Sequence, residues 1–222
     1  MSAFPAPPEV SASELRNAHL VLVHTHYTVD SFLSTFESHV RRRGPGSPTD
    51  QEYDLLRAML VFACSGLDSS IKHAVRDALP AVIDTIDRAA DNFRDFVEKQ
   101  LPMDAQSTTR LLAKVLTTES PRSALVQHLV RDLTGRSLQS KDQILRAGSF
   151  FDIPSSKLVD DMPLFDAVFR ARNQIAHEMD IDFTQPRRNR APRPKQEMVD
   201  YTSAVLGCAA KFLAGVDARL NL

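Results

Sequence analysis

Hydrophobic residues recur along most of this chain at the three-and-four spacing of an amphipathic α-helix. Positions at that spacing share one face of a helix, which is the face that packs against a core. The first such segment runs from residue 13 to about residue 43, and its apolar row is Leu15, Leu22, Val29 and Phe36. The pattern predicts one long helix, with Ser11 or Ser13 as its N-cap.

A second helix is predicted after the stretch GPGSP at residues 44–48, which ends the first. Thr49 followed by Glu52 has the spacing of a capping box, in which each residue accepts a hydrogen bond from a backbone amide of the other. Pro80 predicts a break or a kink, because proline cannot donate the helical hydrogen bond. A third helical stretch then carries the apolar residues Ile83, Ile86, Phe93, Phe96 and Val97.

The middle of the chain, about residues 101–161, has shorter helical patterns. They are interrupted by Pro102, Pro121, Gly135, Gly148 and Pro154. We interpret this region as small helices inserted between long ones, with Ser120-Pro121 starting one of them. Pro163 opens another helix, a loop follows at residues 182–196, and a last helix spans about residues 197–220.

No segment alternates with the period of two that a half-buried strand requires. The predicted fold is therefore all-α: long antiparallel helices with a central insert of shorter ones. A flexible, proline-rich tail is expected at residues 1–10 and a single domain at residues 11–222, because a chain of 222 residues can bury one sizeable core.

Charge and cysteine content narrow the class of protein. A formal net charge of −1 excludes a polycation that coats nucleic acid by charge alone, so any such contact needs a local basic patch. Cys64 and Cys208 are isolated in apolar surroundings and suggest buried thiols in a reducing cytosol. The N-terminus lacks the features of a signal peptide, and no apolar run approaches the length of a membrane span. These features predict a cytoplasmic protein without a membrane partner.

The strongest chemical signal is the stretch RNQIAH, which contains Arg172, Asn173 and His177. Chance alone would place a histidine five positions after an arginine about 0.6 times in a chain of this composition, so the bare spacing carries little weight. Requiring asparagine directly after the arginine lowers the expectation to about 0.01. The location of the stretch, late in a helix and shortly before the final helix, lowers the chance expectation further.

This stretch resembles the arginine-(four to six residues)-histidine motif of the HEPN superfamily, including its preference for a polar residue after the arginine. The predicted helical architecture is loosely similar to a HEPN domain, whereas the insert has no assignable counterpart. The resemblance implies a metal-independent endoribonuclease, often a toxin or phage-defence effector, whose active site forms in a homodimer. It also implies an antitoxin or regulatory protein as a further partner. Asp68 is a candidate for the acidic residue that such proteins often carry on an early helix, facing the motif.

The chemistry of these residues agrees with cleavage of RNA by its own 2′-hydroxyl. The reaction needs a base, an acid and positive charge on the phosphorane. Histidine transfers protons near neutral pH, and arginine clamps phosphate with two donors. We assign proton transfer to His177, phosphate stabilisation to Arg172 and support to Asn173. One chain supplies one such histidine, so two chains across a two-fold axis would supply both proton-transfer groups.

Further arginines extend the expected RNA surface. They are Arg170, close to the motif, and Arg187, Arg188 and Arg190, in the loop before the final helix. The alternative for this loop is that it is a solvated, mobile segment with no role in binding RNA. A metal site at Glu178 and Asp180 is discarded, because the HExxH pattern that HEMD begins lacks its second histidine. No cofactor is expected.

Two alternatives stay open. In the first, the motif has no chemical role: Arg172 is an ordinary surface ion-pair partner, and His177 caps the C-terminal end of its helix. In the second, the domain is a non-catalytic helical module that binds a nucleotide or a partner protein.

Overall fold

The computed structural model describes residues 3–100, 105–184 and 186–222, and every element in those ranges is a helix. An isolated bridge between Ile181 and Arg190 is the one β-type pairing among them. The all-α prediction is confirmed. Pro102, which was expected to interrupt a helix, lies outside the described residues. The elements in chain order are η1 (Ser13–Leu15), α1 (Arg16–Arg43), α2 (Asp50–Asp77), α3 (Leu79–Thr85), α4 (Asp87–Gln100), α5 (Ala105–Leu116), α6 (Pro121–Thr134), α7 (Lys141–Phe150), α8 (Ser155–Leu158), α9 (Met162–Glu178) and α10 (Lys195–Leu220).

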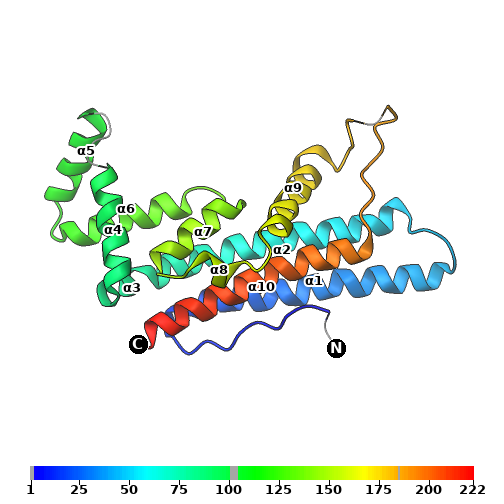
Figure 1. Ribbon diagram of the computed structural model, residues 1–222, viewed down its shortest axis with the longest axis horizontal. Helices are drawn as coiled ribbons and strands as arrows, with labels where there is room; N and C mark the ends of the chain where they lie inside the picture. The colour runs from blue at the N-terminus through cyan, green and yellow to red at the C-terminus, as the bar shows by residue number, and fades with distance from the viewer. Residues whose placement is uncertain (1–2, 101–104, 185) are drawn as a thin grey trace.

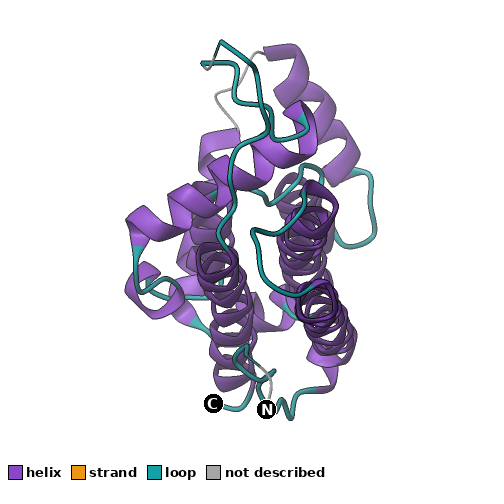
Figure 2. Cartoon of the chain, turned by 90° about the vertical axis from the view of Figure 1, so that its right-hand side faces the viewer, coloured by secondary structure: helices purple, strands orange, loops and turns teal. Residues whose placement is uncertain are grey.

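Three long helices, α1, α2 and α10, form the body of the molecule (Figure 1). Figure 2 looks nearly along them and shows them bundled together. In Figure 1, α1 runs opposite to both α2 and α10, which are parallel to each other. Their apolar rows meet in one continuous core that extends from Phe4 to Val216.

The turn between α1 and α2 follows the sequence prediction. Gly44 and Gly46 both have positive φ, of 85° and 128°, a conformation that is inexpensive for glycine. Thr49 and Glu52 form the predicted capping box, with both reciprocal hydrogen bonds present. Arg43, at the end of α1, adds a hydrogen bond to the Glu52 carboxylate at 3.2 Å. These contacts fix the antiparallel pairing of the two helices.

The two helices approach closely where Gly66 of α2 meets Thr25 of α1. A Cβ atom on residue 66 would overlap with the Thr25 side chain, so glycine permits this approach. Thr25 itself donates its hydroxyl hydrogen to the Val21 carbonyl at 2.7 Å, which satisfies the polar atom inside the packed contact.

The N-terminal segment packs along the bundle rather than projecting from it. Phe4 is buried, and its ring meets the ring of His26 edge-on at 6.4 Å. The backbone amides of Ser11 and Ala12 donate to the Asp217 carboxylate near the end of α10, at 2.9 and 2.8 Å. The prediction that Ser11 or Ser13 caps the first helix is wrong. The Ser11 hydroxyl bonds Asp217, and Ser13 lies inside η1 with its hydroxyl bonded to Glu14.

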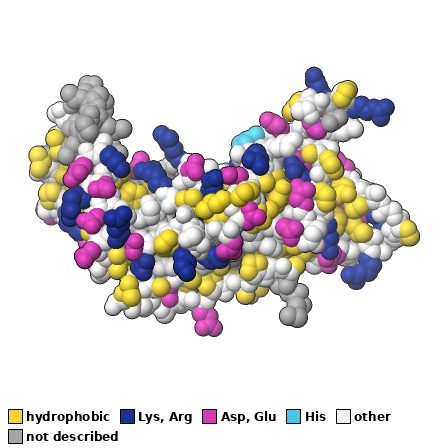
Figure 3. Space-filling view, in the orientation of Figure 1, with side chains coloured by type: hydrophobic (Ala, Val, Ile, Leu, Met, Phe, Trp, Pro, Cys, Tyr) yellow, Lys and Arg dark blue, Asp and Glu magenta, His cyan; other side chains and the backbone are white. Residues whose placement is uncertain are grey.

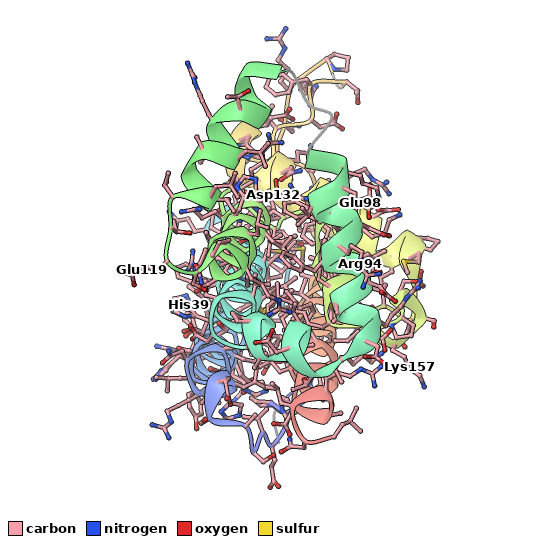
Figure 4. All side chains as sticks on the ribbon, turned by 90° about the vertical axis from the view of Figure 1, so that its left-hand side faces the viewer. His39, Arg94, Glu98, Glu119, Asp132 and Lys157 are labelled. Atoms are coloured by element: carbon pink, nitrogen blue, oxygen red, sulfur yellow. The ribbon has the colours of Figure 1, made fainter. Side chains whose placement is uncertain are left out.

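The short helices gather at one end of the bundle, and they begin with α3, which has Pro80 in its first turn. Figure 4 views this end and shows Arg94 and Glu98 on the outer, exposed side of α4. Their apolar sides join the main core: Phe151 meets Phe212 of α10 at 5.5 Å between ring centroids. The region expected to be an insert therefore shares its core with the long helices.

Candidate functional site

The sequence motif lies on α9, which packs against α2 and α10 (Figure 1). Asp161 caps the helix by accepting a hydrogen bond from the Leu164 amide at 2.9 Å, and Pro163 occupies its first turn. The buried side of α9 is apolar and consists of Phe165, Val168, Phe169, Ala171 and Ile175. Core packing thus fixes which residues of the same helix face solvent.

Arg172 and Asn173 are joined directly. The Arg172 Nη1 atom donates to the Asn173 Oδ1 atom at 2.9 Å. Asn173 is exposed, whereas Arg172 is half-buried and its Nε atom is buried without a hydrogen-bond partner in the described part of the chain. The hydrogen bond to Asn173 thus orients the guanidinium, while the Nε side of the group is enclosed by the protein.

His177 lies one helical turn beyond Asn173 and is exposed in the last turn of α9. Residues four apart stack on one face of a helix, so the imidazole and the amide share the solvent side. No described residue forms a hydrogen bond or an ion pair with His177. One chain thus presents a single accessible imidazole beside an arginine and an amide.

Cys64 of α2 lies within electrostatic range of Arg172. Burial raises the pKa of the Cys64 thiol to about 12, and the nearby charge of Arg172 acts in the opposite direction. The thiol is therefore protonated at neutral pH and is not a nucleophile. The buried cysteine predicted from the sequence is confirmed, as is buried Cys208.

The chain leaves α9 through two residues in the left-handed region. Met179 and Asp180 have φ values of 53° and 61°, and the Asp180 amide donates to the Gln174 carbonyl at 3.0 Å. Neither residue is glycine, and for other residues this conformation requires support from the surroundings. The support comes from the Asp180 side chain.

Asp180 is fully buried between two arginines. Arg57 of α2 donates to Oδ2 of Asp180 at 2.7 Å, and Arg193 donates to Oδ1 at 2.6 Å. Arg193 also donates to the Gln174 side chain of α9 at 3.0 Å, and Arg57 donates to the Ala191 carbonyl at 3.1 Å. We call Arg57, Asp180 and Arg193 the buried ion cluster. It ties the end of α9 and the start of α10 to α2.

A carboxylate pair at the start of α2 extends the cluster to the surface. Asp50 accepts from Arg57 at 2.9 Å and from Arg190 at 3.0 Å, and Asp54 pairs with both arginines. Burial acts to raise the pKa of Asp50, but hydrogen bonds from the two guanidinium groups hold it below its ordinary value. The pKa of Arg57 is raised, because hydrogen bonds to Asp180 and Asp50 outweigh the opposing effect of burial.

Sequence reasoning missed the buried ion cluster. Asp180 was considered only as part of a discarded metal pattern, and Arg57 was not singled out. A local signal did exist, since Asp50, Asp54 and Arg57 are spaced so that they share one helix face. Nothing in that spacing points to Asp180, which is 123 residues away in sequence from its partner Arg57.

The structure divides the predicted RNA-contacting arginines. Arg190 is paired with Asp50 and Asp54 and donates to the Met179 carbonyl at 3.0 Å, so it braces the loop. Arg170, Arg187 and Arg188 are exposed, and no carboxylate in the described ranges forms an ion pair with them.

Asp68 faces another part of the molecule. Its carboxylate accepts a hydrogen bond from the Leu138 amide, between α6 and α7, at 2.5 Å, and it pairs with Lys72 at 2.9 Å. The structure therefore occupies this side chain with contacts to the short helices and does not join it to Arg172, Asn173 or His177.

Two further kinds of site are relevant to the described part of the chain, a metal site and a membrane-spanning helix. The described residues contain no group of three or more histidine, cysteine or acidic side chains placed to hold a metal ion. The expectation that no apolar run approaches the length of a membrane span needs revision, because α10 could cross a membrane by length and composition alone. Half of its most apolar window is nevertheless buried inside the protein. Packing in the core accounts for that apolarity.

Comparisons with protein-family models, with curated proteins and with solved structures gave no significant match.

Proposed function

We propose that this chain is a metal-independent endoribonuclease of the HEPN type that acts as a homodimer. One observation carries the proposal: on α9, half-buried Arg172 donates a hydrogen bond to Asn173 at 2.9 Å, and the exposed His177 lies one helical turn beyond Asn173. This arrangement places a phosphate-binding guanidinium, a supporting amide and an accessible imidazole on one helix.

The reaction follows from the properties of these side chains. The 2′-hydroxyl of the RNA attacks the adjacent phosphorus and loses its proton to one histidine. The bond from phosphorus to the 5′-oxygen breaks, and that oxygen takes a proton from a second histidine. Arg172 stabilises the negative charge that develops on the phosphorane oxygens. The products are a 2′,3′-cyclic phosphate and a free 5′-hydroxyl.

A second copy of the chain provides the second histidine. His177 is exposed and unengaged by the described residues, so it is accessible to a partner chain. A two-fold axis beside α9 would place two imidazoles at one phosphate. In this proposal Asn173 holds the Arg172 guanidinium in position through the hydrogen bond at 2.9 Å.

The proposal is tested with purified protein and a labelled RNA in the presence of EDTA. We expect cleavage with cyclic phosphate ends, and a loss of at least about 100-fold in rate for His177→Ala and for Arg172→Ala. His39→Ala is the matched control, because His39 is an exposed histidine on α1 that lies outside the motif. Activity per chain should fall when the protein is diluted until the dimer dissociates.

Cleavage that persists in His177→Ala, or that requires an added divalent ion, would refute the mechanism. Binding of RNA without cleavage by the unmodified chain would instead indicate a non-catalytic binding module. Circular dichroism and sedimentation of each variant establish that it is folded and has the same oligomeric state.

A further inference from the structure

We infer that the loop between α9 and α10 binds an unpaired segment of RNA beside the motif, with Phe183 stacked on a base and with Arg187 and Arg188 on phosphates. We call these three residues the loop tip. The inference rests on the proposed function, because it assigns that site a substrate class and a means of holding it.

The arginines of this loop have two different environments. Arg190 and Arg193 are neutralised by carboxylates of α2 and by Asp180, and Arg193 is largely buried. Arg187 and Arg188 are exposed and form no ion pair with any residue that the structure describes. The unneutralised charge of the loop therefore lies at its tip, where phosphates are accessible.

Phe183 is an exposed aromatic residue in a fixed backbone. Its side chain is 58% exposed. On one side, the Asp182 amide donates to the Asn189 carbonyl at 2.9 Å. On the other side, the Thr184 amide donates to the Asp182 carboxylate at 3.0 Å, which turns the chain directly after Phe183. The ring is thus presented to solvent although its backbone is held on both sides.

Hydrogen bonds hold the loop next to the motif. The Arg190 Nε atom donates to the carbonyl of Met179, two residues after His177. The Ala191 amide donates to the Asp180 carbonyl at 2.7 Å, at the buried ion cluster. The base of the loop is therefore braced to the end of α9, and in this inference the RNA strand runs from the loop tip toward the end of the helix that carries the motif.

The combination of side chains favours an unpaired strand. At the upper right of Figure 3, where this loop lies, hydrophobic and Lys or Arg side chains are next to each other. An aromatic ring can stack on a base that is not already stacked inside a duplex, and guanidinium groups bind the adjacent phosphates. Cleavage by the 2′-hydroxyl also requires a strand flexible enough to place that hydroxyl in line with the leaving oxygen.

Binding is measured in the His177→Ala background with EDTA, so that the RNA is not cut, using fluorescence anisotropy of a labelled single-stranded oligoribonucleotide. We expect Phe183→Ala to raise the Kd about 5-fold or more. It should also reduce the preference for the single strand over a blunt duplex of the same sequence. Arg187→Gln with Arg188→Gln should lower the slope of log Kd against log salt by about 1.4, the value for two phosphate contacts.

Matched controls separate the loop tip from general effects. Phe62→Ala removes another exposed phenylalanine, on α2, and Arg41→Gln with Arg42→Gln removes two exposed arginines at the end of α1. Neither control should change the Kd more than about twofold, given the small contribution of charges remote from the RNA.

Unchanged RNA binding in the loop-tip variants would overturn the inference, even if His177→Ala abolishes cleavage and the proposed function stands. A change in oligomeric state, without a change in the affinity of the dimer for RNA, would also overturn it and would assign the loop tip to the contact between chains. Weakened binding in the loop-tip variants would support the inference even if cleavage proved independent of His177, in which case the proposed function alone would fail.

Discussion

Asp180 is a fully buried carboxylate whose charge is balanced by the guanidinium groups of Arg57 and Arg193. Two charged partners around one carboxylate leave an excess positive charge if the carboxylate is removed. An uncompensated charge in a buried site is costly, because the protein interior solvates it less well than water does.

Asp180→Asn should therefore destabilise the fold by about 3–5 kcal/mol. Asparagine tolerates the left-handed backbone and has the same shape, so the loss reports the charge. Urea unfolding followed by circular dichroism measures it. Asp54→Asn, whose side chain is half exposed, is the control and should cost less than about 1 kcal/mol. Equal stabilities for Asp180→Asn and the unmodified chain would show that the ion cluster is dispensable.

The residues of the motif differ in how far the sequence could place them. The spacing of four residues places Asn173 and His177 on one face of a helix, and both side chains are exposed on α9. The hydrogen bond between Arg172 and Asn173 could not be predicted, because it depends on a rotamer fixed by packing. The positive φ of Asp180 could not be predicted either, since no glycine marks the turn.

At the scale of elements, the long helices pair through a contact with no room for an added atom. Gly66→Ala would place a Cβ atom against Thr25, so α1 and α2 would have to move apart. We expect a net loss of about 1–3 kcal/mol in spite of the higher helix propensity of alanine. Gly207→Ala, in α10, meets no atom within 4 Å and should instead raise stability by about 0.5–1 kcal/mol. Thermal unfolding checks this pair of variants. The Tm of Gly66→Ala should lie below that of the unmodified chain, and the Tm of Gly207→Ala should lie above it. Two shifts of the same sign would contradict the close packing at Gly66.

Helix ends were predictable where the signal is local. Thr49 and Glu52 are three residues apart and cap α2 as the sequence indicated, and Pro121 begins α6. The N-cap of α1 could not be predicted from a local signal, because Ser11 bonds to Asp217, which is 206 residues away. A local pattern reports local hydrogen bonds, and it carries no information on a distant acceptor that competes for the same donor.

At the scale of the whole molecule, Asp217 and Asp50 join distant segments, and hydrogen bonds hold their pKa values and that of Glu52 below the ordinary range. Burial acts to raise the pKa of Asp217, but hydrogen bonds from the Ala12 and Ser11 amides lower it overall. The pKa of Glu52 is lowered chiefly by the Thr49 amide, whose hydrogen bond outweighs the effect of burial. Asp50 is lowered by its arginines as described.

Stability should consequently be lost in acid. These carboxyls bind protons more readily in the unfolded chain than in the folded one, so their contribution is complete above about pH 5 and disappears as the pH falls through the lower folded values. Urea unfolding between pH 6 and pH 2 measures the loss. In Asp217→Asn, the dependence on pH below about 4 should be shallower. A curve parallel to that of the unmodified chain would show that Asp217 does not contribute.

The overall class of fold was predictable because helical periodicity extends over most of the chain. The joining of the short helices to the main core was not, since Phe151 and Phe212 come from segments whose patterns say nothing of each other. The same limit applies to the buried ion cluster, whose members come from α2, the end of α9 and the residue before Pro194.

The buried ion cluster also restricts how this sequence can diverge. Replacing Asp180 alone removes the buried carboxylate that Arg57 and Arg193 share, and replacing either arginine leaves Asp180 with one cation in place of two. Replacing all three by apolar residues of similar volume can preserve stability. Descendants of this chain should therefore retain the three residues together or lose them together. Among homologous sequences, positions 57, 180 and 193 should co-vary, and an alignment in which they change independently would contradict their mutual dependence.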